Sequence, residues 1–216
     1  MPEAAYALLS NAGLVSLCLV IFILAKNVER RVGAGVVGAI IGLGFGAIAA
    51  TMILNPVRID AGVQVDLRAA MLFLSAFTAG PVAGFICMMV VDAVRLAEGG
   101  VGAGPAVVGA AVHVGLGLLL YRLWQRGGQR QLPLYLVAGT AVMTVVMTAT
   151  IFASGQAAGL TFVREVLPSF AVVLGITVLT LGFLLQQEVA HFGSLQRLVA
   201  AHDRAIQADK DKAAFL

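Results

Sequence analysis

Charged residues are scarce in this chain: only 12% of its 216 residues are Asp, Glu, Lys or Arg, whereas 60% are hydrophobic. Globular domains carry about 25% charged residues, which cover the surface that faces water. The composition therefore excludes a soluble domain and predicts an integral membrane protein whose main partner is the lipid bilayer. A net charge of +3 does not indicate a nucleic-acid partner, because the basic residues lie in short loops between apolar runs.

Cysteine and histidine are also rare, with two and three copies. Cys18 and Cys87 lie inside separate apolar runs, so we expect buried free thiols and no disulfide framework. His113 has no His, Cys or carboxylate three or four residues away, so a metal site lacks ligands. A hydrogen bond between helices is favoured for it over a proton relay. No nucleophile–base pair is visible, and we expect no cofactor, no metal and no enzyme activity in this segment.

Long apolar runs dominate what is present. A transmembrane helix needs about 20 apolar residues, and the runs that qualify are 6–25, 33–54, 105–122, 133–153 and 167–186. Because the first of these lacks a basic leader and a small-residue cleavage site, we interpret it as a retained span and not as a signal peptide.

The segment 66–96 is a sixth apolar run, and Gly80 and Pro81 lie near its middle. At about 1.5 Å per residue, one helix of this length would extend well beyond a hydrocarbon core of about 30 Å. Proline also removes a backbone donor and clashes with the preceding turn. We therefore predict a hairpin of two short helices, 66–79 and 81–96, with Gly80 and Pro81 as its structural hinge.

Basic residues gather in three regions of the chain, and the positive-inside rule assigns such regions to the cytoplasm. All three regions fall on one side of the membrane only if 66–96 enters and returns to the same side. We therefore predict an all-α polytopic membrane bundle of five full spans plus the broken hairpin, with the N-terminus outside and the C-terminus in the cytoplasm. The basic residues are Lys26, Arg30 and Arg31, then Arg122, Arg126 and Arg130, then Arg197, Arg204, Lys210 and Lys212.

The hairpin would bring Arg68 and Arg95 to the same membrane surface, with Asp66 and Asp92 close by. Each guanidinium offers a planar fork of donors that suits a carboxylate. These four residues therefore form a candidate ligand-binding site for a small anionic metabolite. Arginines near helix ends also extend to lipid headgroups or pair with neighbouring acids, here Asp66 or Asp92, and that alternative stays open.

Glycines serve two purposes in these predictions. Gly99 and Gly100 belong to a flexible loop that could close over the ligand, so both are candidate ligand-binding residues. The loop lacks the Lys-Ser/Thr ending of a phosphate-binding loop and has no strand before it, which excludes a nucleotide site of that kind. Gly38, Gly42 and Gly46 recur at four-residue spacing, which indicates close packing between helices.

Helical patterning continues after Gln186 with alternating three- and four-residue steps. The pattern predicts a coiled-coil seam, suited to a parallel homodimer; a solvated amphipathic tail is the alternative. We expect a transmembrane sensor domain at 1–187 and a cytoplasmic signalling helix at 188–216 that leads to an output domain beyond Leu216. The seam positions are Phe192, Leu195, Val199, His202, Ile206, Asp209, Ala213 and Leu216.

The successive motifs Asp66-Leu-Arg68, Ala-Gly-Pro81-Val-Ala-Gly84, Asp92-Ala-Val-Arg95 and Gly99-Gly100 resemble the LytS-type five-transmembrane sensor domain of bacterial signalling proteins, over roughly 33–187. The short helix that ends in Gly-Pro also looks distantly like the substrate-binding components of energy-coupling-factor vitamin transporters. The first resemblance implies a bacterial inner-membrane location. It further implies that arginines at the positions of Arg68 and Arg95 recognise a small, pyruvate-like carboxylate outside the cell.

Two further segments bear on this resemblance. Pyruvate-sensing members carry small polar or thiol side chains just after the glycine pair, where this chain has Ala106 and Gly109, so it departs from them there.

The segment 205–216 resembles the lead-in to the phosphoacceptor helix of sensor histidine kinases. We therefore expect the membrane input module of a histidine kinase, or of another signalling output such as a diguanylate cyclase. The alternative is a substrate-binding subunit of a small-solute transporter, which has little use for a long coiled-coil tail.

Overall fold

The structure of the chain is a computed structural model that describes residues 2–54, 56–60, 63–127 and 131–214. Arg130 and Leu216, which entered the predictions above, lie outside these ranges.

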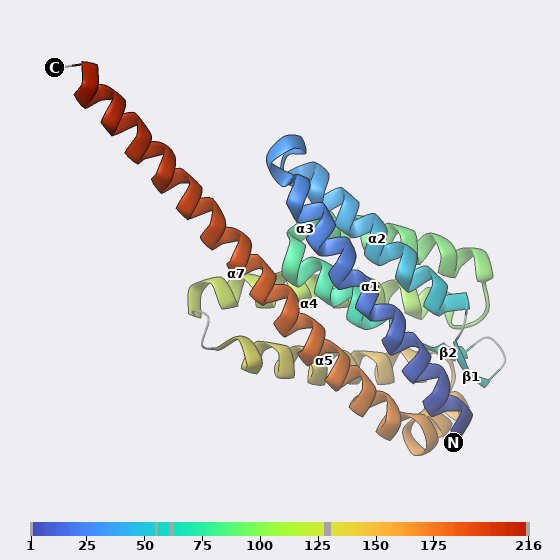
Figure 1. The fold of residues 1–216 in the computed structure, drawn as a ribbon. Helices are drawn as coiled ribbons and strands as arrows, with labels where there is room; N and C mark the ends of the chain where they lie inside the picture. The colour runs from blue at the N-terminus through green and yellow to red at the C-terminus, as the bar shows by residue number, and fades with distance from the viewer. Residues whose placement is uncertain (1, 55, 61–62, 128–130, 215–216) are drawn as a thin grey trace.

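Long helices make up almost the whole molecule, which confirms the all-α bundle (Figure 1). A short helix α6 (Gln156–Thr161) and a π-helix η2 (Phe162–Val166) lead into the last long helix. The long helices are α1 (Pro2–Val32), α2 (Ala34–Leu54), α3 (Arg68–Glu98), α4 (Ala103–Gly127), α5 (Leu132–Ser154) and α7 (Leu167–Ala214).

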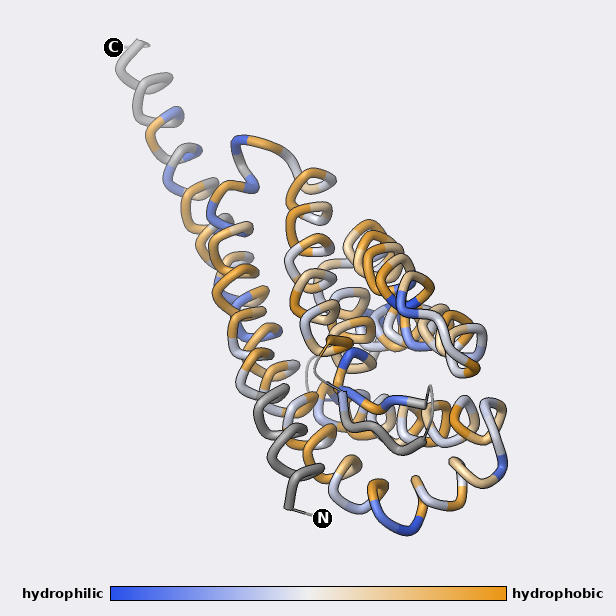
Figure 2. The backbone as a smooth tube through the Cα atoms, turned by 90° about the vertical axis from the view of Figure 1, so that its right-hand side faces the viewer, coloured by the Kyte–Doolittle hydropathy of each residue, from blue (hydrophilic) through white to orange (hydrophobic). Residues whose placement is uncertain are grey.

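Five apolar stretches of the described residues are long enough to cross a membrane: α2, α3, α4, α5 and Gln156–Val199. Figure 2 shows hydrophobic residues along the bundle helices and hydrophilic ones toward helix ends and along the projecting C-terminal segment. α1 is not one of the five, but its Cys18 and Phe22 are fully buried, and the helix packs against α2 and α7. Cys18 and Cys87 are buried free thiols, as expected.

A two-stranded antiparallel ribbon precedes α3, and no strand was predicted there. β1 (Val57–Asp60) pairs with β2 (Val63–Val65), with Val57 opposite Val65. β-branched residues are enriched in strands because they fit a pleated surface. The valines of this segment are such a signal. The segment is short and lies between two long apolar runs, so its strand pattern was too weak to predict. The ribbon places Gln64 beside the start of α3.

The predicted hairpin is present, because α3 turns back on itself at Gly80 (Figure 1). Gly80 has φ +83°, a conformation that glycine adopts without steric cost, and Pro81 follows it. A Cβ atom on Gly84 would lie 2.8 Å from the Cβ of Ala76. The two residues would be about 12 Å apart along a straight helix. The first leg begins at Arg68, two residues later than predicted, and the second ends at Glu98.

The first leg of α3 is the most enclosed part of the molecule. Every residue from Val65 to Thr78 is buried, and the rings of Phe73 and Phe77 stack at 5.5 Å between centroids. The leg packs against α4, where Gly117 approaches the Phe73 carbonyl. A broken helix is tolerated at membrane depth only when protein surrounds the freed backbone groups, and this packing meets that condition.

The second leg packs against α2 through the predicted glycine stripe. A Cβ on Gly42 would lie 2.6 Å from the carbonyl oxygen of Ala83, and one on Gly46 would lie 2.8 Å from Val90. Gly38 faces Val82 in the same way. The prediction that these glycines allow close helix packing is confirmed.

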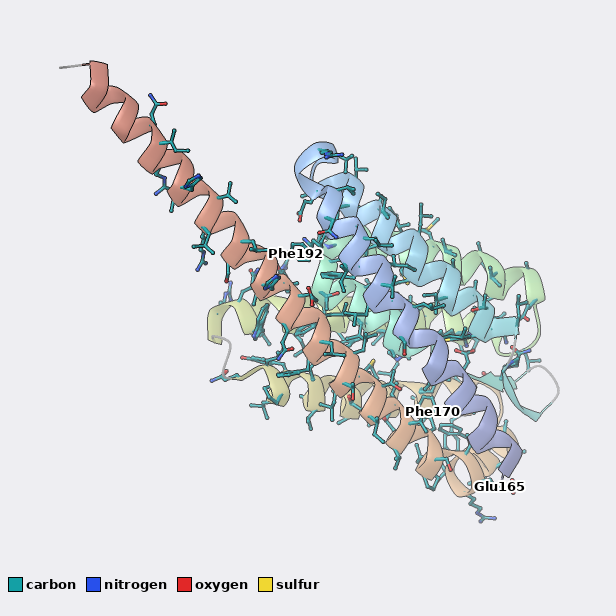
Figure 3. The ribbon with its side chains drawn as sticks, viewed as in Figure 1. Glu165, Phe170 and Phe192 are labelled. Atoms are coloured by element: carbon teal, nitrogen blue, oxygen red, sulfur yellow. The ribbon has the colours of Figure 1, made fainter. Side chains whose placement is uncertain are left out.

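α7 continues past the bundle as one uninterrupted helix of 48 residues (Figure 3). In that view Phe170 lies within the bundle, Glu165 projects from one end, and Phe192 lies near the point where α7 leaves it. Beyond that point the large apolar side chains are exposed, including Leu195 at 43% and Ile206 at 42%. The boundary predicted at 187 therefore falls inside a continuous helix.

Replacing Gly42 by alanine should destabilise the protein, because the new methyl group would meet the backbone of the second leg. Overpacking of this kind costs about 1–3 kcal/mol, so the midpoint of thermal unfolding in detergent should fall. Gly115→Ala is the matched control, since nothing lies within 4 Å of a Cβ there. Equal effects of the two substitutions would contradict the packing role of Gly42.

Candidate functional site

Arg68 and Arg95 line the same cavity, although Arg68 is the first residue of α3 and Arg95 lies in its last turn. The cavity lies at the end of the bundle that bears the ribbon, and it is bounded by β2, both legs of α3, the start of α4 and the end of α5. Its lining residues are Gln64, Arg68, Ala69, Leu72, Arg95, Gly102, Ala106, Gly109, Ala110, His113, Met147, Thr150, Ile151 and Ser154.

Arg68 is buried and paired with Asp66. Its Nη1 lies 3.5 Å from Asp66 Oδ2, and its backbone N–H donates to Asp66 Oδ1 at 2.9 Å. A carboxylate at the start of a helix also interacts favourably with the helix dipole. Asp66 is fully buried but is not among the cavity-lining residues. Asp66 therefore positions Arg68, whose Nη1 makes no hydrogen bond with any described residue.

Arg95 is 3% exposed and forms an ion pair with Glu98, at 3.3 Å between Nη1 and Oε2. Glu98 was not predicted to pair with it, although the three-residue spacing on one helix favours such a contact. Asp92, the predicted partner, is half-buried and does not line the cavity. Its carboxylate instead interacts electrostatically with Arg68. Of the two predicted acids, Asp66 and Asp92 therefore both lie near Arg68, while Glu98 pairs with Arg95. A part for Asp66 and Asp92 in ligand binding stays a prediction.

Gly99 and Gly100 are not among the residues that line the cavity. They have φ values of +73° and +88°, a region that side chains other than glycine rarely adopt. The pair makes the tight turn between α3 and α4, which brings Gly102 and Ala106 to the cavity. The geometry therefore gives Gly99 and Gly100 a backbone role in place of the predicted ligand contact.

His113 and Gln64 are polar cavity residues that the site prediction omitted. His113 is 4% exposed, and its ring interacts with the backbone of Met143 on α5, in line with the expected contact between helices. Its Nε2 and the Oε1 of Gln64 are buried without a hydrogen-bond partner among the described residues. The sequence does hold a signal for the α4 face: Ala106, Gly109 and His113 recur at three- and four-residue spacing.

The α5 wall of the cavity bears two hydroxyl groups that are tied to their own helix. Thr150 Oγ1 donates to the Met147 carbonyl at 2.8 Å, and Ser154 Oγ donates to the Thr150 carbonyl at 2.9 Å. Threonine and serine hydroxyls within helices commonly bond in this way to carbonyls of the preceding turn. Gly109 allows α5 to approach, because a Cβ there would lie 3.0 Å from the methyl group of Thr150.

The cavity is small, with a volume of about 30 Å³. A small organic acid has several heavy atoms, so this space is narrow for such a ligand.

The fold and the site define a class: a polytopic helical membrane module with buried cationic side chains that converge on one cavity at an end of the bundle. The family model described as 5TMR of 5TMR-LYT matches residues 17–188, and the chain belongs to this family of five-transmembrane receptor domains. This confirms the family that the sequence motifs indicated. No curated protein and no solved structure is significantly similar to the chain. The matched region is a membrane sensory input module.

Asp66→Asn should destabilise the protein far more than Glu98→Gln. The Asp66 side chain is fully buried beside Arg68, whereas the Glu98 side chain is 25% exposed. Removing one partner of a buried ion pair costs about 3–5 kcal/mol, and a solvent-accessible pair contributes about 0–1 kcal/mol. Denaturation in mixed detergent micelles would measure both variants. A loss for Asp66→Asn of about 1 kcal/mol or less would contradict the stabilising role of the buried Asp66–Arg68 pair, because about 3–5 kcal/mol is expected.

Proposed function

We propose that this module binds a small organic carboxylate between Arg68 and Arg95 on the extracytoplasmic side and relays its presence to a histidine kinase. The observation that carries the proposal is the convergence of two buried guanidinium groups, from distant positions on the hairpin, on one cavity. Burial strengthens charge-assisted hydrogen bonds, because water no longer competes for the donors.

The charges around the cavity suit an anion. The Arg68 guanidinium has five N–H donors, and its ion pair with Asp66 occupies only part of that fork. Asp66 and Glu98 are not among the residues that line the cavity, so they approach the guanidinium groups from outside it. The Nη1 of Arg68 forms no hydrogen bond with a described residue and can donate to a ligand carboxylate. His113 and Gln64 offer a second polar contact for a hydroxyl or keto group on the same ligand.

Binding in this cavity would change the packing of the hairpin. Since the cavity is narrow for an organic acid, we expect ligand entry to move the hairpin relative to α4 or α5. The ligand then favours the wider state by its difference in affinity for the two states. To raise the wider state from about 1% to 99% of the molecules, the ligand must bind that state about 5.5 kcal/mol more favourably than the other. α7 contacts α3 and α5, so it can carry the change along its length.

The proposed output is cytoplasmic and dimeric. The basic residues of the α1–α2 turn and of α4 lie at the end opposite the arginine cavity, which supports a cytoplasmic assignment for that end in a bacterial inner membrane. α7 leaves the bundle there and exposes apolar side chains that a second copy would cover. A parallel coiled coil leading to a kinase domain fits this arrangement. A transport subunit remains the second candidate, and the long projecting helix favours the sensor over it.

The carboxylate site can be tested by titration calorimetry with a panel of short mono- and dicarboxylates. Arg68→Ala and Arg95→Ala should each weaken binding about thirtyfold or more, because truncating one partner of a buried charged contact costs about 2–5 kcal/mol. Arg122→Ala, at the opposite end of the bundle, should leave binding unchanged. Wild-type affinity in both cavity variants would exclude this site.

Dimerisation through α7 can be tested by oxidative cross-linking in membranes. Val199 lies on the predicted seam and is exposed, so Val199→Cys should form a disulfide between two copies. Arg204→Cys, also exposed but off the seam, should cross-link much less. The native thiols are buried and add little background. Equal cross-linking at both positions would indicate random collisions and not a coiled coil.

A further inference from the structure

A second cavity of about 510 Å³ lies at the opposite end of the bundle from the arginine cavity, around the hinge of the hairpin. Lys26 of α1, Gly80 and Pro81 of the hinge, Tyr121 and Trp124 of α4, and Val189 of α7 line it. Pockets for small ligands have volumes of about 300–1,000 Å³. This cavity is therefore large enough to hold a ligand group in the state that the structure shows.

Hydrogen-bond donors dominate the chemistry of this second cavity. The indole Nε1–H of Trp124 is buried and has no hydrogen-bond partner among the described residues. Lys26 Nζ pairs with Glu29 at 3.0 Å, which leaves two of the three ammonium hydrogens available. The amide of Gln125 donates to the Tyr121 hydroxyl at 2.5 Å, and the Tyr121 hydroxyl can donate in turn.

Gly80 and Pro81 of the hinge also line this cavity, at the point where one leg of α3 ends and the other begins. The dipoles of the two legs oppose each other there, so the backbone supplies no net preference for either sign of charge. The cation and the buried indole donor therefore provide the attraction, and they suit a group with several anionic oxygens.

We infer that this second cavity binds the phosphate headgroup of an anionic phospholipid. Trp, Tyr and Lys at helix ends are typical of the membrane interface, where lipid phosphates lie. The helices that form the cavity also expose apolar side chains to the lipid region, including Leu119 at 55% and Val82 at 44%. Acyl chains can cover these side chains while the headgroup occupies the cavity. A soluble phosphate compound shares the headgroup chemistry and is the other source to be distinguished.

The position of the site gives the lipid a structural effect. The cavity contacts the hinge of the hairpin and Val189, close to the point where α7 leaves the bundle. A bound headgroup would connect the hinge and α7. The lipid composition of the membrane would therefore affect how α7 packs against the hairpin where it leaves the bundle.

Trp124 is the only tryptophan of the chain, so its fluorescence reports on this cavity alone. The full chain is reconstituted into phosphatidylcholine vesicles that contain increasing fractions of phosphatidylglycerol with brominated acyl chains. We expect saturable quenching that exceeds the quenching by brominated phosphatidylcholine at the same fraction. Lys26→Ala should raise the half-saturating fraction about tenfold, the effect of losing one charge-assisted contact. Arg31→Ala, an exposed cation in the same end of the bundle, should leave it unchanged.

Three outcomes of the quenching experiment would overturn the inference. Equal quenching by both brominated lipids would show ordinary exposure to the bilayer, and equal effects of the two substitutions would show general surface attraction. A saturable response to inorganic phosphate in pure phosphatidylcholine vesicles would assign the cavity to a soluble ligand. If Lys26→Ala fails to fold, native mass spectrometry of wild type and Trp124→Phe provides the second measurement. Retention of phosphatidylglycerol by the wild type alone supports the site, and equal retention contradicts it.

Discussion

The break in α3 at Gly80 and Pro81 is the constraint on which the rest of the structure depends. It frees backbone groups at the end of the bundle opposite the arginine cavity, so neighbouring helices must pack closely around the broken helix. The complete burial of the first leg from Val65 to Thr78 is the result. Glycines on α2, α4 and the second leg allow neighbouring backbones to approach closely enough to provide that enclosure.

The same break determines where polar side chains can collect. Because the chain returns to its starting side, Arg68 and Arg95 meet at one end, and the hinge lies at the other. Each end therefore combines a cavity with donors that protein groups satisfy only in part. Burying such donors without partners is costly, so both ends are suited to ligands that accept hydrogen bonds. The apolar rings of Phe73 and Phe77 lie between the two ends.

Much of the fold could be predicted from the sequence, because membrane spans depend on length and hydrophobicity alone. The Gly80–Pro81 break, the side of the membrane shared by Arg68 and Arg95 and the glycine stripe on α2 also follow from local chemistry. The ribbon at Val57–Val65 could not be predicted, since strands this short give only a weak sequence pattern. In the site, His113 and Gln64 could not be placed, because their approach to the arginines depends on how α4 and β2 pack against the hairpin.

The small size of the arginine cavity bears on how a module of this kind can signal. A cavity that already fitted its ligand could bind it without moving any helix, and a ligand that favours no state shifts no equilibrium. Here the polar groups that line a cavity of about 30 Å³ belong to three elements of the fold, β2, α3 and α4. A ligand that contacted Arg68, Gln64 and His113 together would touch all three elements, and any displacement needed to admit it would reach α7 through the contacts between α7 and α3.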